Sequence, residues 1–111
     1  MTTYRTLEQI TTLNKVEYNH WGLMCDLSNN DYDISYFGGR VTANSNFNDF
    51  LQDLDSFDIN EIIVYLDTEL MDCQKENEIY KNEYNISNEN YVGYIDEIQF
   101  LLSYVKFNYY L

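Results

Sequence analysis

Residues 16–42 read VEYNHWGLMCDLSNNDYDISYFGGRVT, and this stretch decides the expected fold class. Apolar residues at alternate positions from Trp21 to Leu27 favour one strand, and those from Tyr32 to Tyr36 favour a second. Between them lies SNND, residues 28–31, a cluster of turn-forming residues. Gly38-Gly39 favours a further turn or bulge, which leaves room for a short third strand. We therefore expect an antiparallel β-hairpin or small sheet over about residues 16–42.

Outside this stretch the apolar residues recur at helical spacing. Four helices are expected: over residues 4–14 with Thr2 or Thr3 as its cap, from Asn44 or Ser45 onward, over about 58–84, and over 91–105. Residues 61–66 fit a strand as well, because Ile62, Ile63 and Val64 are β-branched. The stripe that continues through Leu66, Leu70 and Cys73 favours a helix there.

A hairpin of two or three strands is not stable alone in water, so the helices must pack on it. A chain of 111 residues has the length of one domain. We therefore expect a single α+β domain over residues 1–111, with a short sheet packed by three or four helices. Its expected core consists of Trp21, Leu23, Phe47, Phe50, Leu54, Leu66, Ile98 and Leu102.

The chain is strongly acidic, with 19 Asp and Glu against 6 Lys and Arg, a net charge of −13. Direct nucleic-acid binding of the usual kind is excluded, because so few cations cannot neutralise a run of phosphates. Attraction to an anionic membrane surface is excluded by the same sign of charge. Disorder is disfavoured, since 17% of the residues are aromatic.

The negative charge is concentrated in residues 49–97, which hold 14 acids and 2 bases, a net charge of −12. On a helix, many of these carboxylates fall along one side, with Tyr65 among them. Such a row of anions with an interleaved aromatic ring suits arginines, by ion pairing and by stacking. The candidate partner-binding residues are Asp53, Asp55, Asp58, Glu61, Tyr65, Glu69, Asp72, Glu76 and Glu83.

No motif in the sequence indicates catalysis. His20 is the only histidine, and the serines lie in no nucleophile-elbow context. Asp31-x-Asp33 begins like an EF-hand loop, but the sixth position is Tyr36 rather than glycine. Cys25 and Cys73 form no metal-binding or redox motif, and we expect both to be buried and reduced. We expect no enzyme activity, no cofactor and no metal site.

A small, acidic, aromatic-rich chain without catalytic motifs resembles the DNA-mimic inhibitors of phages and mobile elements, the anti-CRISPR and anti-restriction proteins. The resemblance rests on size, charge and the clustering of acids in 49–83 and 89–97. It implies binding to a basic nucleic-acid-binding protein, such as a Cas nuclease or a restriction enzyme, and blocking of its nucleic-acid site.

Two other interpretations stay open: an immunity protein that neutralises a nuclease toxin, and a non-enzymatic accessory protein. The N-terminal residues contain no apolar run typical of a signal peptide, and no stretch is long enough to span a membrane. We therefore expect the cytoplasm of a host cell as the compartment.

Overall fold

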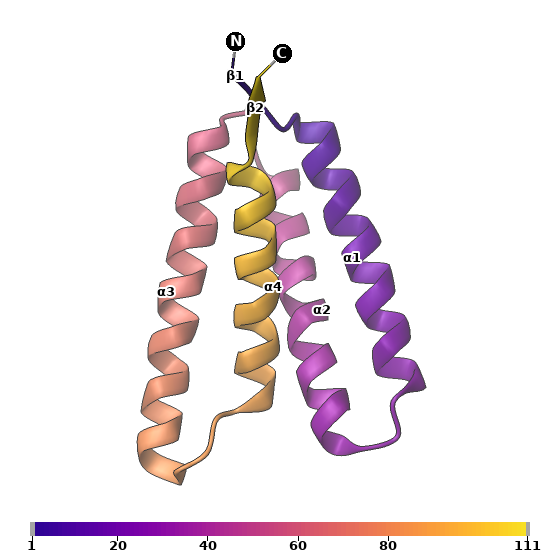
Figure 1. Ribbon diagram of the computed structural model, residues 1–111, viewed down its shortest axis with the longest axis vertical. Coiled ribbons are helices and arrows are strands. Elements are labelled where there is room, and N and C mark those ends of the chain that lie inside the picture. Colours follow the sequence, from indigo (N-terminus) through magenta and orange to yellow (C-terminus); the bar gives the residue numbers. More distant parts are fainter. Residues whose placement is uncertain (1, 111) are drawn as a thin grey trace.

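Four helices make up most of the molecule (Figure 1), and the computed structural model describes residues 2–110, with the side chains of residues 4–107. The helices are α1 (Leu7–Leu27), α2 (Asp31–Gln52), α3 (Ile59–Tyr84) and α4 (Glu89–Lys106). Two three-residue strands, β1 (Thr2–Tyr4) and β2 (Asn108–Tyr110), pair in an antiparallel manner where the two ends of the chain meet.

The predicted α+β fold with a hairpin at residues 16–42 is wrong, because this stretch forms the second half of α1 and the first half of α2. The expected turn at residues 28–31 exists, but it joins two helices. Ser28 is the C-cap of α1, and the side chain of Asn30 accepts a hydrogen bond from the backbone N–H of Asp33 at 2.9 Å, which begins α2.

The other predicted helices are present, but their ends differ. The helix expected from Asn44 or Ser45 is the second half of α2, which begins at Asp31, so the assignment of either residue as a cap is wrong. Helix α1 begins later than expected, because Thr6 and Gln9 form a capping box there. Residues 61–66 are helical, as favoured, within a helix that Asp58 caps. Helix α4 follows the polar break near residue 88, where the side chain of Asn88 accepts hydrogen bonds from the N–H groups of Asn90 and Tyr91.

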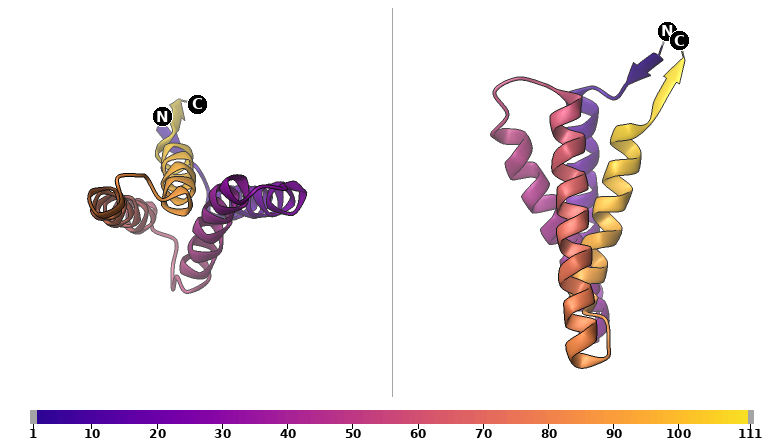
Figure 2. Two further views of the ribbon diagram at one scale, coloured as in Figure 1. Left: turned by 90° about the horizontal axis from the view of Figure 1, so that it is seen from below. Right: turned by 90° about the vertical axis from the view of Figure 1, so that its left-hand side faces the viewer.

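Helices α2 and α4 occupy the middle of the molecule, and the other two helices flank them (Figure 2). Helix α1 packs mainly on α2, and α3 packs mainly on α4. Because of this order, α1 and α3 lie on opposite sides of the central pair, and neither of them covers both central helices.

The backbones of α2 and α4 approach closely at two glycines. A Cβ atom on Gly39 would overlap the backbone oxygen of Asn90, and one on Gly93 would overlap the backbone oxygen of Tyr36. The interpretation of Gly38-Gly39 as a turn or bulge is therefore wrong. Gly39 lies inside α2, and the absence of its side chain lets α4 pack directly against the backbone.

The expected core is confirmed in part. Phe47, Leu66, Ile98 and Leu102 are buried, and Phe50 and Leu54 are partly buried against them. Leu23 is 56% exposed, which contradicts its assignment to the core. Trp21 is half-buried, and its ring stacks on Phe37 at 5.6 Å between centroids. Cys73 is buried as expected, whereas Cys25 is only half-buried.

Three helices meet at a buried layer of polar side chains. Arg40 of α2 forms an ion pair with Glu97 of α4 at 2.8 Å, and Glu97 is fully buried. The side-chain amide of Asn44 donates hydrogen bonds to Glu97 Oε2 and to Asn14 Oδ1 of α1, each at 2.8 Å. Buried charges are tolerated only when they are paired and hydrogen-bonded, so this layer fixes the alignment of α1, α2 and α4.

Burial raises the pKa of the Glu97 carboxyl group to about 7, and the nearby Glu17 of α1 adds to the increase. The hydrogen bond from Asn44 and the charge of Arg40 act in the opposite direction. The guanidinium of Arg40 also lies over the ring of Trp21, 4.0 Å from its centroid, and donates to the hydroxyl of Tyr36. The charge of this arginine is therefore satisfied entirely inside the fold.

The close helix contact predicts opposite effects of the same substitution at two glycines. Gly39→Ala should lower the free energy of unfolding by about 1–3 kcal/mol, because the new methyl group must displace the backbone of α4. Gly22→Ala should raise it by about 0.5–1 kcal/mol, since a Cβ there meets no atom within 4 Å. Urea unfolding followed by circular dichroism measures both values. Equal effects of the two substitutions would contradict the close contact.

The raised pKa of Glu97 predicts a pH dependence of stability. Between its ordinary value of 4.5 and about 7, the folded protein holds a proton that the unfolded chain has lost. The free energy of unfolding should therefore fall as pH rises through this range, by up to about 1.4 kcal/mol per pH unit from this group. Glu97→Gln removes the titrating group and should make the fall shallower.

The exposed Glu8→Gln serves as the control and should leave the slope unchanged. Unfolding free energies from urea titrations at several pH values between 4.5 and 7 give the three slopes. Parallel curves for the wild type and Glu97→Gln would show that Glu97 does not titrate in this range.

Candidate functional site

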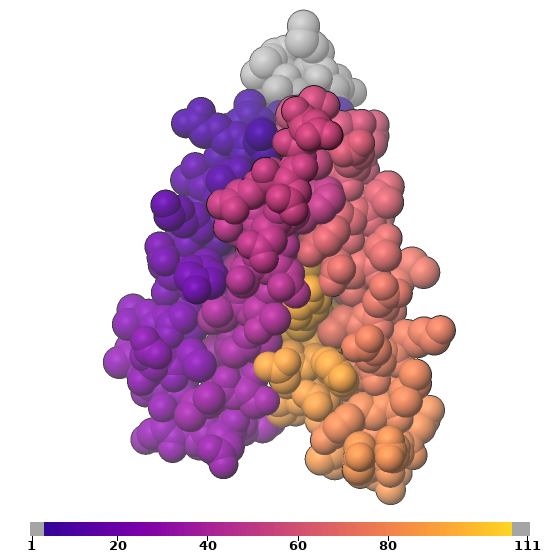
Figure 3. Space-filling model, turned by 180° about the vertical axis from the view of Figure 1, so that it is seen from behind, coloured from indigo at the N-terminus to yellow at the C-terminus, as the bar shows by residue number. Residues whose placement is uncertain are grey.

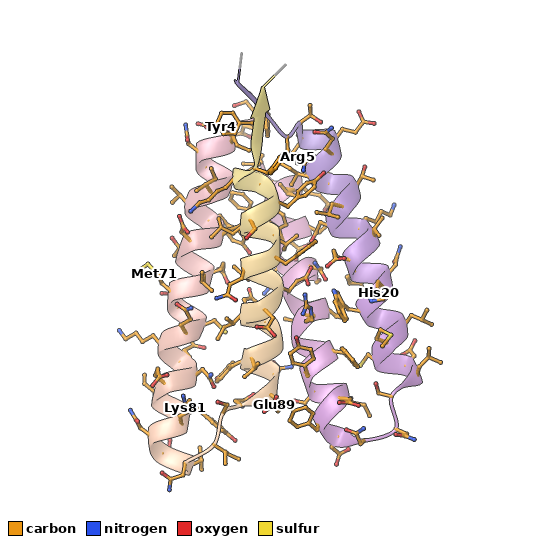
Figure 4. The ribbon with its side chains drawn as sticks, viewed as in Figure 1. Tyr4, Arg5, His20, Met71, Lys81 and Glu89 are labelled. Carbon is orange, nitrogen blue, oxygen red and sulfur yellow. The ribbon has the colours of Figure 1, made fainter. Side chains whose placement is uncertain are left out.

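Helix α3 carries most of the predicted partner-binding residues and lies at one edge of the molecule. Its apolar stripe, with Ile62, Leu66 and Cys73 buried, packs against the core. Because a helix turns once every 3.6 residues, the predicted carboxylates lie in a row next to this stripe, on one flank of α3. Met71 lies on the opposite, outward side of α3 (Figure 4), where it is 68% exposed.

Three consecutive depressions follow α3; residues of α2 line the first two together with α3, and the third lies between α3 and α4. Their volumes are about 490, 390 and 300 Å³. The first and second share Glu69, and the second and third share Glu76. From Glu61 to Glu83 they extend over ~33 Å at a helix rise of ~1.5 Å per residue.

We call this surface the acidic groove and define it by the predicted residues that line it: Asp58, Glu61, Tyr65, Glu69, Asp72, Glu76 and Glu83. Helix α2 provides its other wall through Phe50, Asn46 and Thr42. Figure 3 shows the surface hollowed between α2 and α3, with α4 visible underneath.

Most carboxylates of the acidic groove have no partner within the described residues. Glu61, Asp72, Glu76 and Glu83 are exposed, and none of them takes part in a described hydrogen bond or ion pair. Acids elsewhere on α3 differ, since Asp67 pairs with Lys106 at 3.8 Å and Glu78 pairs with Lys81 at 3.4 Å. The uncompensated charge of α3 is therefore gathered in the groove.

Titratable groups in the groove respond to this negative charge. Burial raises the pKa of the Cys73 thiol to about 11, and Glu76 and Glu69 raise it further. Burial likewise raises the pKa of Tyr65 to about 12, with Glu69 and Asp49 as additional causes. Both groups are neutral at pH 7, so the carboxylates alone determine the charge of the groove.

Glu69 differs from its neighbours because it is held in place. The hydroxyl of Tyr94 donates a hydrogen bond to Glu69 Oε2 at 2.7 Å, and it accepts one from the side-chain amide of Asn46 at 3.2 Å. This chain of bonds connects α2, α4 and α3 across the bottom of the groove. Burial and the hydrogen bond to Glu69 both raise the pKa of Tyr94.

Tyr65 is partly a structural residue. Its ring stacks on Phe50 at 4.2 Å and near Phe47 at 6.0 Å between centroids, with the planes almost parallel in both pairs. One side of the ring still lines the first depression. Replacing Tyr65 would therefore disturb the packing of α2 on α3 as well as any contact with a partner.

Two predicted residues lie outside the groove. Asp53 is the C-cap residue of α2, and Asp55 belongs to the connection between α2 and α3; both are exposed. They place negative charge near the N-terminal end of α3 without lining a depression.

Three tyrosines of the third depression are not among the predicted site residues. Tyr80 and Tyr84 come from α3, and Tyr91 comes from α4. A signal was present for two of them, because Tyr80 and Tyr84 follow Glu76 at steps of four residues and so lie on neighbouring turns of α3. The contribution of Tyr91 depends on how α4 packs.

A further depression of about 490 Å³ lies between α1 and α2 and has a different character. Amide and hydroxyl side chains such as Asn14, Tyr18 and Asn44 line it, and Lys15 is its only charged lining residue. Within the described residues, no group of three or more potential metal-ligating side chains occurs. The described helices include none that is both long enough and apolar enough to cross a membrane.

No protein-family model matches the chain, and no curated protein sequence and no solved structure matches it either.

Proposed function

We propose that this protein binds a basic nucleic-acid-binding protein through the acidic groove and thereby blocks the site where that partner holds nucleic acid. The supporting observation is the row of carboxylates without described partners that lines three consecutive depressions along α3. Like charges three or four residues apart destabilise a helix by about 0.2–0.5 kcal/mol per pair. A cationic partner would offset this cost.

The partner that best suits such a surface is a defence nuclease, a Cas effector or a restriction enzyme. These enzymes hold nucleic acid in positively charged channels. A folded anionic surface is drawn to such a channel by the same long-range electrostatics that steer DNA to it. The protein would act in the cytoplasm of the host cell by competition, with no chemical step and no cofactor.

The groove imitates a nucleic-acid strand only coarsely. Carboxylates three to four residues apart on a helix recur every ~5–6 Å, whereas a DNA strand carries a phosphate every ~3.4 Å. The exposed Asp53 and Asp55 at the N-terminal end of α3 add to the density. Because the groove is already folded, little conformational entropy is lost on binding, which compensates for the lower charge density.

An immunity protein directed at a nuclease toxin is the second candidate. The tyrosines among the carboxylates favour it, since tyrosine is common in the hot spots of protein–protein interfaces. The two candidates differ in a simple way. DNA displaces a partner held at its nucleic-acid channel, and it does not displace one held at another surface.

Reversing charges in the groove should abolish partner binding. The double variant Asp72→Lys/Glu76→Lys spares Glu69, which accepts the hydrogen bond of Tyr94. Because like charges across an interface cost several kcal/mol, we expect at least ~100-fold weaker binding. The measurement is capture of a nuclease from a lysate by tagged protein, at low and moderate salt, followed by an affinity titration with the captured enzyme.

Glu8→Lys/Asp26→Lys on α1 is the matched control, with the same change of net charge at exposed positions outside the groove. Binding by the control should weaken only slightly. Equal losses in both variants would show that overall charge, and not the groove, governs binding. Added DNA should release the captured nuclease; retention would favour the immunity-protein candidate.

A further inference from the structure

The end of the acidic groove nearest the α3–α4 connection is lined by tyrosine rings. Tyr80 and Tyr84 of α3 lie 4.5 Å apart between ring centroids, with their planes inclined at 46°. Tyr91 of α4 meets Tyr80 edge-on at 6.2 Å. We call these three rings the tyrosine cage. They line the depression of about 300 Å³ described above.

Two carboxylates, Glu76 and Glu83, line the same depression. Both are exposed and have no described hydrogen-bond or ion-pair partner. Helix α3 carries two lysines near them: Lys81 is paired with Glu78 instead, and Lys75, next to Glu76 in sequence, takes part in no described ion pair. The depression therefore combines the negative faces of aromatic rings with uncompensated anionic groups, and both features attract a cation.

The same chain contains this combination with its cation in place. The guanidinium of Arg40 lies 4.0 Å from the centroid of the Trp21 ring, while its Nε donates to Glu97 Oε1 at 3.0 Å. Arg5 lies 4.2 Å from the centroid of the Tyr104 ring. Arg40 thus shows, in this fold, how one guanidinium satisfies a ring and a carboxylate together.

We propose that the tyrosine cage binds the guanidinium of an arginine side chain from the partner, with Glu76 and Glu83 accepting its hydrogen bonds. This inference rests on the proposed function, because it names the partner group that the end of the acidic groove receives. It places a specific anchor at one end of a surface whose other contacts are electrostatic.

The chemistry of the depression favours guanidinium over other cations. A guanidinium is planar, so it stacks on a tyrosine face while its N–H groups point outward to carboxylates. A lysine ammonium is strongly hydrated and does not stack. A quaternary ammonium fits a ring of aromatic side chains but has no N–H to offer, and would leave both carboxylates without hydrogen bonds.

The direct test uses the isolated protein and two short peptides, acetyl-Ala-Arg-Ala-amide and acetyl-Ala-Lys-Ala-amide. Nuclear magnetic resonance follows the ring protons of Tyr80, Tyr84 and Tyr91 during each titration. The arginine peptide should shift these three signals in a saturable way, with an affinity at least ~5-fold higher than that of the lysine peptide. A third peptide with trimethyllysine tests the quaternary ammonium.

Tyr84→Ala removes a ring that is 55% exposed at the end of α3, and Glu83→Gln removes one charge without changing shape. Each should weaken binding of the arginine peptide at least ~3-fold. Tyr32→Ala is the matched control, since Tyr32 is an exposed helical tyrosine like Tyr84 but lies outside the cage. The control should bind the arginine peptide like the wild type.

Equal binding of the arginine and lysine peptides would overturn the assignment to guanidinium, and stronger binding of trimethyllysine would replace it with a quaternary ammonium. Unchanged binding by Tyr84→Ala and Glu83→Gln would also overturn it. These outcomes are independent of the nuclease capture. If the tyrosine cage binds the arginine peptide but the protein captures no nuclease, the proposed function is wrong and the arginine site is still supported.

Discussion

The contact between α2 and α4 at Gly39 and Gly93 sets the position of the other elements. Two helices can approach this closely only where neither carries a side chain, and the overlap of a Cβ atom with the opposite backbone demonstrates how little space remains. Arg40 directly follows Gly39, and Glu97 lies one turn beyond Gly93. The glycine contact therefore brings this ion pair within bonding distance in the interior.

The acidic groove follows from the same arrangement. Helix α3 packs on α4, and it meets α2 through the stacked rings of Phe47, Phe50 and Tyr65. Away from these rings the surface is hollowed between α2 and α3, with α4 underneath (Figure 3). A bundle in which α3 packed equally on both central helices would bury the carboxylates that now line this space, at a high cost in desolvation.

The sequence was sufficient to predict α3 and α4, whose apolar stripes continue without interruption from turn to turn. It was insufficient for α1 and α2. Their inward stripe contains Asn14, Arg40 and Asn44, because the interior at that level is a hydrogen-bonded layer. Polar residues at buried positions interrupt the helical spacing of the apolar residues. The apolar residues that remain alternate along the chain, which is typical of a strand. Gly39 also led to a wrong prediction, because a glycine that helix packing requires cannot be told from a turn glycine in the sequence.

The candidate site was predictable to a similar degree. Charge can be counted in a sequence, so the carboxylates on α3 were identified, and most of them line the groove. Other parts of the site join residues from different helices. Phe50 stacks on Tyr65, Tyr94 donates a hydrogen bond to Glu69, and Tyr80 meets Tyr91 edge-on. Such contacts depend on the packing of helices, which the spacing within one helix does not contain.

The location of the two arginines has a consequence for how copies of the protein behave toward one another. Arg5 and Arg40 are the only arginines, and both lie against aromatic rings of their own chain. A second copy therefore brings no spare guanidinium to the tyrosine cage, and its charge of −13 repels the first copy. Both features oppose self-association through the proposed tyrosine cage, so copies of the chain would not compete with a partner for it.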